Sequence, residues 1–339
     1  MSLNFEICLL NFELKIIETP RDAFQGIKQF IPTETKVQII NTLLRAGFDT
    51  VEAGSFVSQK VIPQMADTSH VLRGLDKSGS NSRVMVLVVS KRGAMRAVRQ
   101  GTPACHPVSG NSQQSSVISR QSSVRNSEFG IRSPESGTRN PEQQANIDDI
   151  LFPFSASPTF LKRNLNASTD KAKGIIQDLM EVCGQHNKRL IVYLSMSFGN
   201  PYGDPWDPGI IEEYAGYLYE LGHRIIPLSD ILGEVAPETI STVFSRVINT
   251  FPEVEFGAHF HSLPGAEYPK IDAAWKAGVR RFDTVTGGFG GCPMAADHMV
   301  SNLNTFALVD YCKKNGIEHG LDVGVLKEAS LLMAEGIGQ

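Results

Sequence analysis

The stretch EFGAHFH, Glu255 to His261, joins a nearly continuous apolar run to two histidines. A run of this kind is typical of a strand buried on both faces, as strands of a parallel sheet are. His259 and His261 are two residues apart, so on a strand their imidazoles point to the same side. The stretch therefore predicts a buried parallel strand that ends in a pair of nitrogen ligands for a divalent metal.

Working outward, similar runs of apolar or β-branched residues alternate with amphipathic windows of helical period. The eight strand candidates are Leu14–Glu18, Thr50–Ala53, Val84–Val89, Ile150–Phe154, Leu190–Ser195, Arg224–Leu228, Glu255–Phe260 and Arg280–Thr284. The helical windows include Glu34–Ala46, Lys171–Cys183, Ile210–Leu221, Pro237–Thr250 and Pro269–Ala277. Eight strand-then-helix units predict an α/β protein, a TIM (β/α)8 barrel. An open doubly wound sheet is the alternative, but no GxGxxG opens the first unit.

One segment, residues 101–146, departs from this alternation. It is rich in Ser, Gln, Asn, Arg and Pro and has no period of two or 3.6 residues. Such a composition buries too little apolar surface to order itself, so we expect a disordered, low-complexity insertion before the fourth strand. We otherwise expect residues 1–339 to form a single barrel domain.

The overall composition excludes several classes of partner. The 339 residues are 41% hydrophobic and 20% charged, with a formal net charge of −4, so nothing points to nucleic acid or to an anionic membrane surface. The five cysteines form no CxxC pair, which indicates reduced thiols. No apolar run reaches the roughly 18 residues of a membrane span, and the first residues resemble neither a secretory signal nor a transit peptide. We expect a cytoplasmic protein.

Polar side chains gather after the predicted strands, where the catalytic groups of such barrels lie. They are Arg21, Asp22, Glu52, Asp230, His259, His261, Cys292 and Asn302. Each has an ordinary structural explanation when taken alone, such as a helix cap for the aspartates. Their common position at one end of the predicted barrel is what favours an active site.

Four of these residues, Asp22, His259, His261 and Asn302, would supply an O,N,N,O set of metal ligands. Oxygen and imidazole donors without thiolate favour Mg²⁺ or Mn²⁺, and Zn²⁺ is the less favoured alternative. Cys292 lies in the glycine-rich stretch GGFGGCP, where it could be a mobile thiol near the cation. A metal beside such a thiol suggests chemistry next to a carbonyl group.

In several stretches the chain resembles the 3-hydroxy-3-methylglutaryl-CoA lyase family, which is part of a wider group of barrel metallolyases. The resemblance covers about Leu14 to Asn304, with the polar insertion as a break. The matching stretches are ETPRDAFQG (18–26), VEAGSFVSQKVIPQM (51–65), GNPYGDPW (199–206), PLSDILGE (227–234), GAHFH (257–261) and GGFGGCPMA (287–295).

The resemblance implies a role for each candidate residue. The metal ligands are Asp22, His259, His261 and Asn302, and the catalytic residues are Arg21, Asp22, His259 and Cys292. Arg21 would hold the carbonyl or enolate oxygen of the substrate, and Cys292 would carry a proton. Glu52 and Asp230 would lie around the metal and the substrate, while Lys28 would approach the CoA phosphates. The family further implies an acyl-CoA substrate and a homodimer.

Three positions depart from the family pattern. Ser262 stands where an acidic residue usually follows the second histidine, the eighth strand ends in DTVTG, and Phe306 lies where the family has an acidic residue. Carboxylates that orient metal ligands contribute about ten- to a hundredfold in affinity, so their loss predicts a weaker site.

The leading hypothesis is a metal-dependent carbon–carbon lyase that cleaves 3-hydroxy-3-methylglutaryl-CoA, or a similar 3-hydroxyacyl-CoA, to acetyl-CoA and acetoacetate. A related aldolase or acyl-CoA condensing enzyme is an alternative. A non-catalytic barrel that binds acyl-CoA is another.

Overall fold

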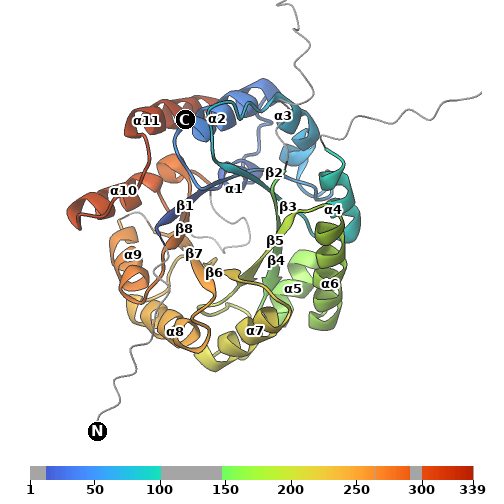
Figure 1. The fold of residues 1–339 in the computed structure, drawn as a ribbon, viewed down its shortest axis with the longest axis vertical. Helices are drawn as coiled ribbons and strands as arrows, with labels where there is room; N and C mark the ends of the chain where they lie inside the picture. Colours follow the sequence, from blue (N-terminus) through green and yellow to red (C-terminus); the bar gives the residue numbers. More distant parts are fainter. Residues whose placement is uncertain (1–12, 101–146, 264, 291–299, 339) are drawn as a thin grey trace, which may run out of the picture.

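Eight parallel strands close into a ring in the computed structural model, which describes residues 13–100, 147–263, 265–290 and 300–338 (Figure 1). The strands are β1 (Lys15–Glu18), β2 (Thr50–Ser55), β3 (Arg83–Leu87), β4 (Asp149–Ser155), β5 (Arg189–Ser195), β6 (Ile225–Asp230), β7 (Glu255–Ser262) and β8 (Arg281–Thr284). Each pairs with the next, and β8 pairs with β1, which closes the ring. The predicted (β/α)8 barrel is confirmed.

Helices surround this ring and cover its outer face, except that the short α1 lies at the carboxyl ends of the strands (Figure 1). They are α1 (Pro20–Gln25), α2 (Thr33–Arg45), α3 (Thr68–Gly74), α4 (Lys91–Val98), α5 (Pro158–Leu165), α6 (Thr169–Gln185), α7 (Pro208–Glu220), α8 (Pro237–Thr250), α9 (Glu267–Lys276), α10 (Thr305–Lys314) and α11 (Val323–Ile337). Four of them begin with proline, whose fixed φ and missing N–H suit the first helical position. Helix α11 packs against α2.

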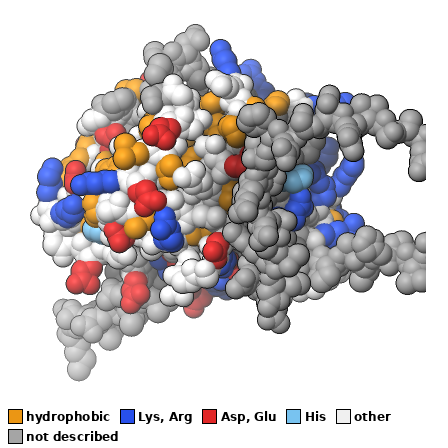
Figure 2. All heavy atoms as spheres, turned by 90° about the horizontal axis from the view of Figure 1, so that it is seen from above, with side chains coloured by type: hydrophobic (Ala, Val, Ile, Leu, Met, Phe, Trp, Pro, Cys, Tyr) orange, Lys and Arg blue, Asp and Glu red, His pale blue; other side chains and the backbone are white. Residues whose placement is uncertain are grey.

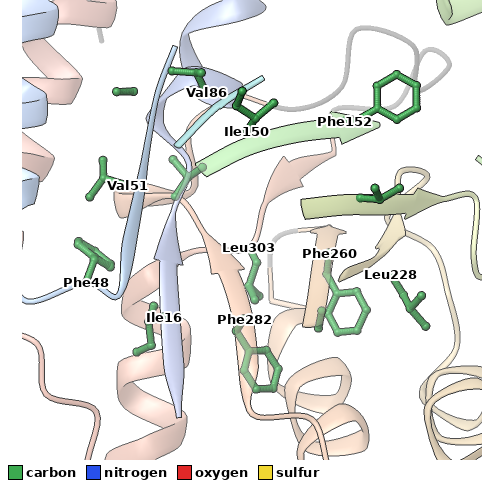
Figure 3. Packing of buried hydrophobic residues seen from close by; sticks show 14 of the residues in the cluster. Ile16, Phe48, Val51, Val86, Ile150, Phe152, Leu228, Phe260, Phe282 and Leu303 are labelled. Carbon is green, nitrogen blue, oxygen red and sulfur yellow. The ribbon is translucent and has the colours of Figure 1, made fainter. Parts of the chain in front are cut away.

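The main core lies between the strands and the helices, where outward-facing side chains of the strands pack (Figure 3). Ile16, Val51, Val86 and Phe282 belong to this layer, and all are 3% exposed or less. A smaller apolar cluster fills the inside of the ring and includes Ile17, Met85, Leu151, Ile191 and Tyr193. The alternation of strand side chains between two apolar environments explains why these sequences are nearly continuous in apolar residues.

The amino-terminal ends of three neighbouring strands are joined by a buried carboxylate. Asp149 Oδ1 lies 2.6 Å from Arg83 Nη2, and its Oδ2 lies 2.7 Å from Arg189 Nη2. Arg281, at the start of β8, is fully buried and reaches Glu255 Oε1 at 3.3 Å. These ion pairs lie at the opposite end of the strands from the candidate site, so we assign them to stability.

The expected insertion, residues 101–146, falls between α4 and β4 and lies outside the described residues. One face of the molecule carries acidic, basic and apolar side chains together (Figure 2), in keeping with the small formal charge. Within the described ranges, no helix combines the length and apolar character that crossing a membrane requires.

Candidate metal centre and active site

Three ligand-type side chains meet at the carboxyl ends of the strands. Asp22 lies in α1, directly after β1, while His259 and His261 lie on β7 and face the same side. Asp22 Oδ2 is 3.7 Å from His261 Nε2 and 3.9 Å from His259 Nε2. One donor atom from each residue falls within 4.8 Å of the other two. One carboxylate and two imidazoles at this spacing fit a single divalent cation.

His259 is oriented by a carboxylate on the neighbouring strand. Asp283 of β8 pairs in register with His259, and its Oδ2 lies 3.1 Å from His259 Nδ1. When Nδ1 carries the proton, Nε2 is left with a lone pair toward Asp22. The sequence analysis did not include Asp283, because the DTVTG stretch was interpreted only as a departure. The expected lack of carboxylate support is therefore wrong for His259, since Asp283 supplies it.

The charges in this cluster act on one another. Burial opposes ionisation of Asp22, but the charges of Arg21 and the two histidines hold its pKa well below the usual range. Burial also acts against the charged form of His259, yet the hydrogen bond and charge of Asp283, followed by the charge of Asp22, raise its pKa. A carboxylate that stays ionised and an imidazole held by a carboxylate are both suited to binding a cation.

Arg21 is fixed beside this cluster by two acidic side chains. Its Nε and Nη2 donate to Glu52 Oε1 and Oε2 at 2.8 and 2.9 Å, and Nη1 donates to Asp22 Oδ1 at 3.0 Å. Gln25, which the sequence analysis missed, accepts from Arg21 Nη1 at 2.9 Å and donates to Asp22 Oδ1. The negative neighbours raise the pKa of Arg21 even though burial lowers it, so the guanidinium stays charged.

Asn302 lies beside His261 on another segment. It belongs to β9 (Ser301–Asn302), which runs antiparallel to the end of β7 and pairs Asn302 directly with His261. Directly paired residues of antiparallel strands place their side chains on one face. The Nδ2 of Asn302 donates to the Phe289 carbonyl at 3.0 Å, so its Oδ1 remains the atom suited to a metal.

The remaining candidates lie elsewhere. Asp230 is turned away from the site: Lys270 Nζ lies 3.0 Å from its Oδ2, and the backbone N–H of Gly233 donates to its Oδ1 at 3.1 Å. Lys28 is exposed and lines a small cavity of about 330 Å³ that shares Gln25 with the main one. Cys292 lies outside the described residues.

The main cavity has a volume of about 500 Å³ and two unlike halves. The charged half contains Arg21, Asp22, Glu52, His259, His261 and Asp283. The other half comes from β3, β4, α5 and the residue that follows β6, and its largest apolar side chains are Leu87, Leu151, Phe160, Leu165 and Ile231. Tyr193, on the inner face of β5, lies between the halves with its ring edge-on to His259, at 5.7 Å between centroids. A polar reacting group and an apolar substituent could thus be bound together.

Known proteins are similar to this chain in sequence and in fold. The family described as HMGL-like matches residues 13–332. A cytoplasmic 3-hydroxy-3-methylglutaryl-CoA lyase of Danio rerio is 28% identical, over 96% of this chain and 83% of its own length. A mitochondrial hydroxymethylglutaryl-CoA lyase of Bos taurus is also 28% identical, over 96% of this chain and 86% of its own length. The crystal structure of the HMG-CoA lyase from Brucella melitensis has a TM-score of 0.77 and 26% identity, over 96% of this chain and 99% of that one.

Proposed function

Because this chain belongs to the HMGL-like family, we propose that it is a metal-dependent carbon–carbon lyase that cleaves 3-hydroxy-3-methylglutaryl-CoA to acetyl-CoA and acetoacetate. The observation that carries the proposal is the convergence of Asp22, His259 and His261 beside the fixed guanidinium of Arg21. All four side chains line one cavity at the carboxyl ends of the strands, where barrel enzymes hold their catalytic groups.

In this proposal Asp22, His259, His261 and Asn302 hold the cation. Their two oxygen and two imidazole donors favour Mg²⁺ or Mn²⁺ over Zn²⁺. When bound, the cation lowers the pKa of the substrate's tertiary hydroxyl by Lewis-acid chemistry.

The protein side chains then carry the proton and charge movements. A carboxylate oxygen of Asp22 removes the proton of the tertiary hydroxyl, since both ring nitrogens of His259 are already engaged, and the new carbonyl forms as the adjacent carbon–carbon bond breaks. The electron pair of that bond passes into the thioester enolate, whose negative charge Arg21 stabilises. Cys292 gives its S–H proton to the enolate carbon, which completes acetyl-CoA. The other fragment is acetoacetate.

Glu52 and Gln25 make this arrangement possible by holding Arg21 before the substrate arrives. The two parallel hydrogen bonds from Arg21 to Glu52 fix the plane of the guanidinium. Gln25 and Asp22 both accept hydrogen bonds from Arg21 Nη1. A donor fixed in advance stabilises developing charge without the cost of reorganisation. We place the thioester at Arg21 and the CoA phosphates near Lys28, whose exposed ammonium can meet one of them.

The test is direct. The metal-loaded protein is incubated with 3-hydroxy-3-methylglutaryl-CoA, and acetoacetate is measured; formation of no product by the folded, metal-loaded protein would refute the proposal. His261→Ala should lose both the metal and the activity. His186→Ala, exposed after α6, is the matched control and should keep both.

Two coarser predictions go with this function. A homodimer is expected from the family, and sedimentation analysis would check it. A cytoplasmic location also stays a prediction, because the similar lyases include both a cytoplasmic and a mitochondrial enzyme.

A further inference from the structure

The apolar side of the main cavity presents more surface than one methyl group can cover, because Leu87, Leu151, Phe160, Leu165 and Ile231 all line it. Within the described residues, no charged side chain of β3, β4, α5, β5 or β6 lines the cavity. Among the described lining residues Arg21 is the one arginine or lysine, and it lies on the metal side beside Asp22. A carboxylate of the substrate is therefore directed toward the metal side, and an uncharged part of the substrate must meet the opposite wall.

Helix α5 supplies the centre of this wall. Phe160 is 2% exposed and packs with Met196 and Ile231, which are 2% and 8% exposed. Leu165, at the end of the same helix, is half-buried and also faces the cavity. Well-packed side chains of this kind form a firm surface, because a packed interior resists local displacement.

The loop after β5 fixes α5 in place. Asp204, in the GNPYGDPW stretch, accepts hydrogen bonds from Ser157 Oγ at 2.5 Å, from Thr159 N at 2.9 Å and from Thr159 Oγ1 at 2.8 Å. Its carboxylate thus lies at the amino-terminal end of α5, where a negative charge is stabilising. Arg163 of α5 lies over the ring of Tyr202 in the same loop, at 4.6 Å. The stretch therefore holds the apolar wall against the cavity.

We propose that the wall built by Phe160, Leu165 and Ile231 binds an alkyl branch longer than methyl on the hydroxyl-bearing carbon of the substrate. The preferred substrates are then 3-hydroxy-3-alkylglutaryl-CoA thioesters with an unbranched alkyl group of several carbons. This inference rests on the proposed function, since it assumes that the charged half holds the polar end of an acyl-CoA.

Binding of non-cleavable analogues tests the inference without turnover. 3-Alkylglutaryl-CoA thioesters, which lack the hydroxyl group, are titrated calorimetrically into the metal-loaded protein, with methyl, propyl and hexyl branches. Each methylene removed from water should tighten binding about fourfold, so propyl should bind about fifteenfold more tightly than methyl. The thioester arm is common to the series, so its own contacts with the wall cannot create a dependence on branch length.

A pair of variants locates the effect. Leu165→Asn should flatten the dependence of affinity on branch length. Leu190→Asn makes the same change at a half-buried leucine of β5 that lies outside the main cavity, and it should preserve the dependence. Equal or falling affinity from methyl to hexyl would overturn the inference and leave the proposed function intact. Binding of none of the thioesters would overturn both.

Discussion

Replacement of Asp283 by asparagine tests how the metal centre is held. The carboxylate accepts from His259 Nδ1 at 3.1 Å and so favours the tautomer whose Nε2 is free to bind a cation. An asparagine at this position has the same shape, but it has no charge and can donate its amide N–H to Nδ1. The proton would then move to Nε2 and compete with the metal. Since carboxylates of this kind contribute about ten- to a hundredfold in affinity, Asp283→Asn should weaken Mn²⁺ binding by about 1.4 to 2.8 kcal/mol.

Electron paramagnetic resonance measures free Mn²⁺ directly and gives this affinity without any turnover. Asp178→Asn is the matched control, because Asp178 is an exposed carboxylate of α6 that pairs with Lys91 and lies away from the cavity. A urea denaturation of each variant shows whether the fold is kept. If folded Asp283→Asn bound Mn²⁺ as tightly as the unchanged protein, the assignment of Asp283 to His259 would be refuted.

Four further predictions follow from the same geometry. Arg21→Gln should abolish acetoacetate formation. It should also lower the free energy of unfolding, measured in urea, by about 3 kcal/mol, because Glu52 would be left buried without the guanidinium that pairs with it. Asp230→Asn should also destabilise the fold by about 3 kcal/mol in urea, because the carboxylate is the buried partner of Lys270. Mn²⁺ affinity should be constant above the raised pKa of His259 and should fall about tenfold per pH unit below it, because a proton then competes with the metal for the imidazole. Since this pKa is raised, the fall should begin above the usual imidazole value of 6.5. Mn²⁺ titrations at a series of pH values check this. Cys292→Ser should keep Mn²⁺ bound while slowing acetoacetate formation; wild-type turnover would contradict its role as proton donor.

The order of the strands could be predicted because each strand is buried on both faces and has a continuous apolar sequence. The window Pro237–Thr250 coincides with α8, whose proline start is a local signal. Strand β3 begins and ends earlier than the window Val84–Val89, since the pairing with β2 and not the hydrophobicity of Val88 and Val89 decides where it stops. The two-residue strand β9 could not be predicted, because a strand so short has no period.

Three residues selected from the sequence by their chemistry, Asp22, His259 and His261, lie together in the structure, whereas strand register decides which neighbouring residues join them. Ser229 pairs with His259 and lines the cavity, whereas Asp230 pairs with Phe260 and faces outward. Both lie at the end of the same strand, so composition could not separate them. Asp283 could have been found by the same alternation, because its register partner is His259. The position of a residue at a strand end therefore predicts at which end of the barrel it lies. The alternation of side chains along the strand decides whether it faces the inside of the barrel or the surrounding helices.

Asp230 nevertheless supports the proposed metal centre from outside the ring, through Lys270. Lys270 Nζ donates to Asp230 Oδ2 at 3.0 Å, to the Gly233 carbonyl at 2.6 Å and to the His261 carbonyl at 2.9 Å. The buried pair therefore holds the backbone of His261, while Asp283 holds the ring of His259 from inside the barrel. One histidine is positioned through its side chain and the other through its main chain. The PLSD stretch is then best explained as a support for the ligand strand, because a ligand can face a cation steadily only when its backbone is fixed as well.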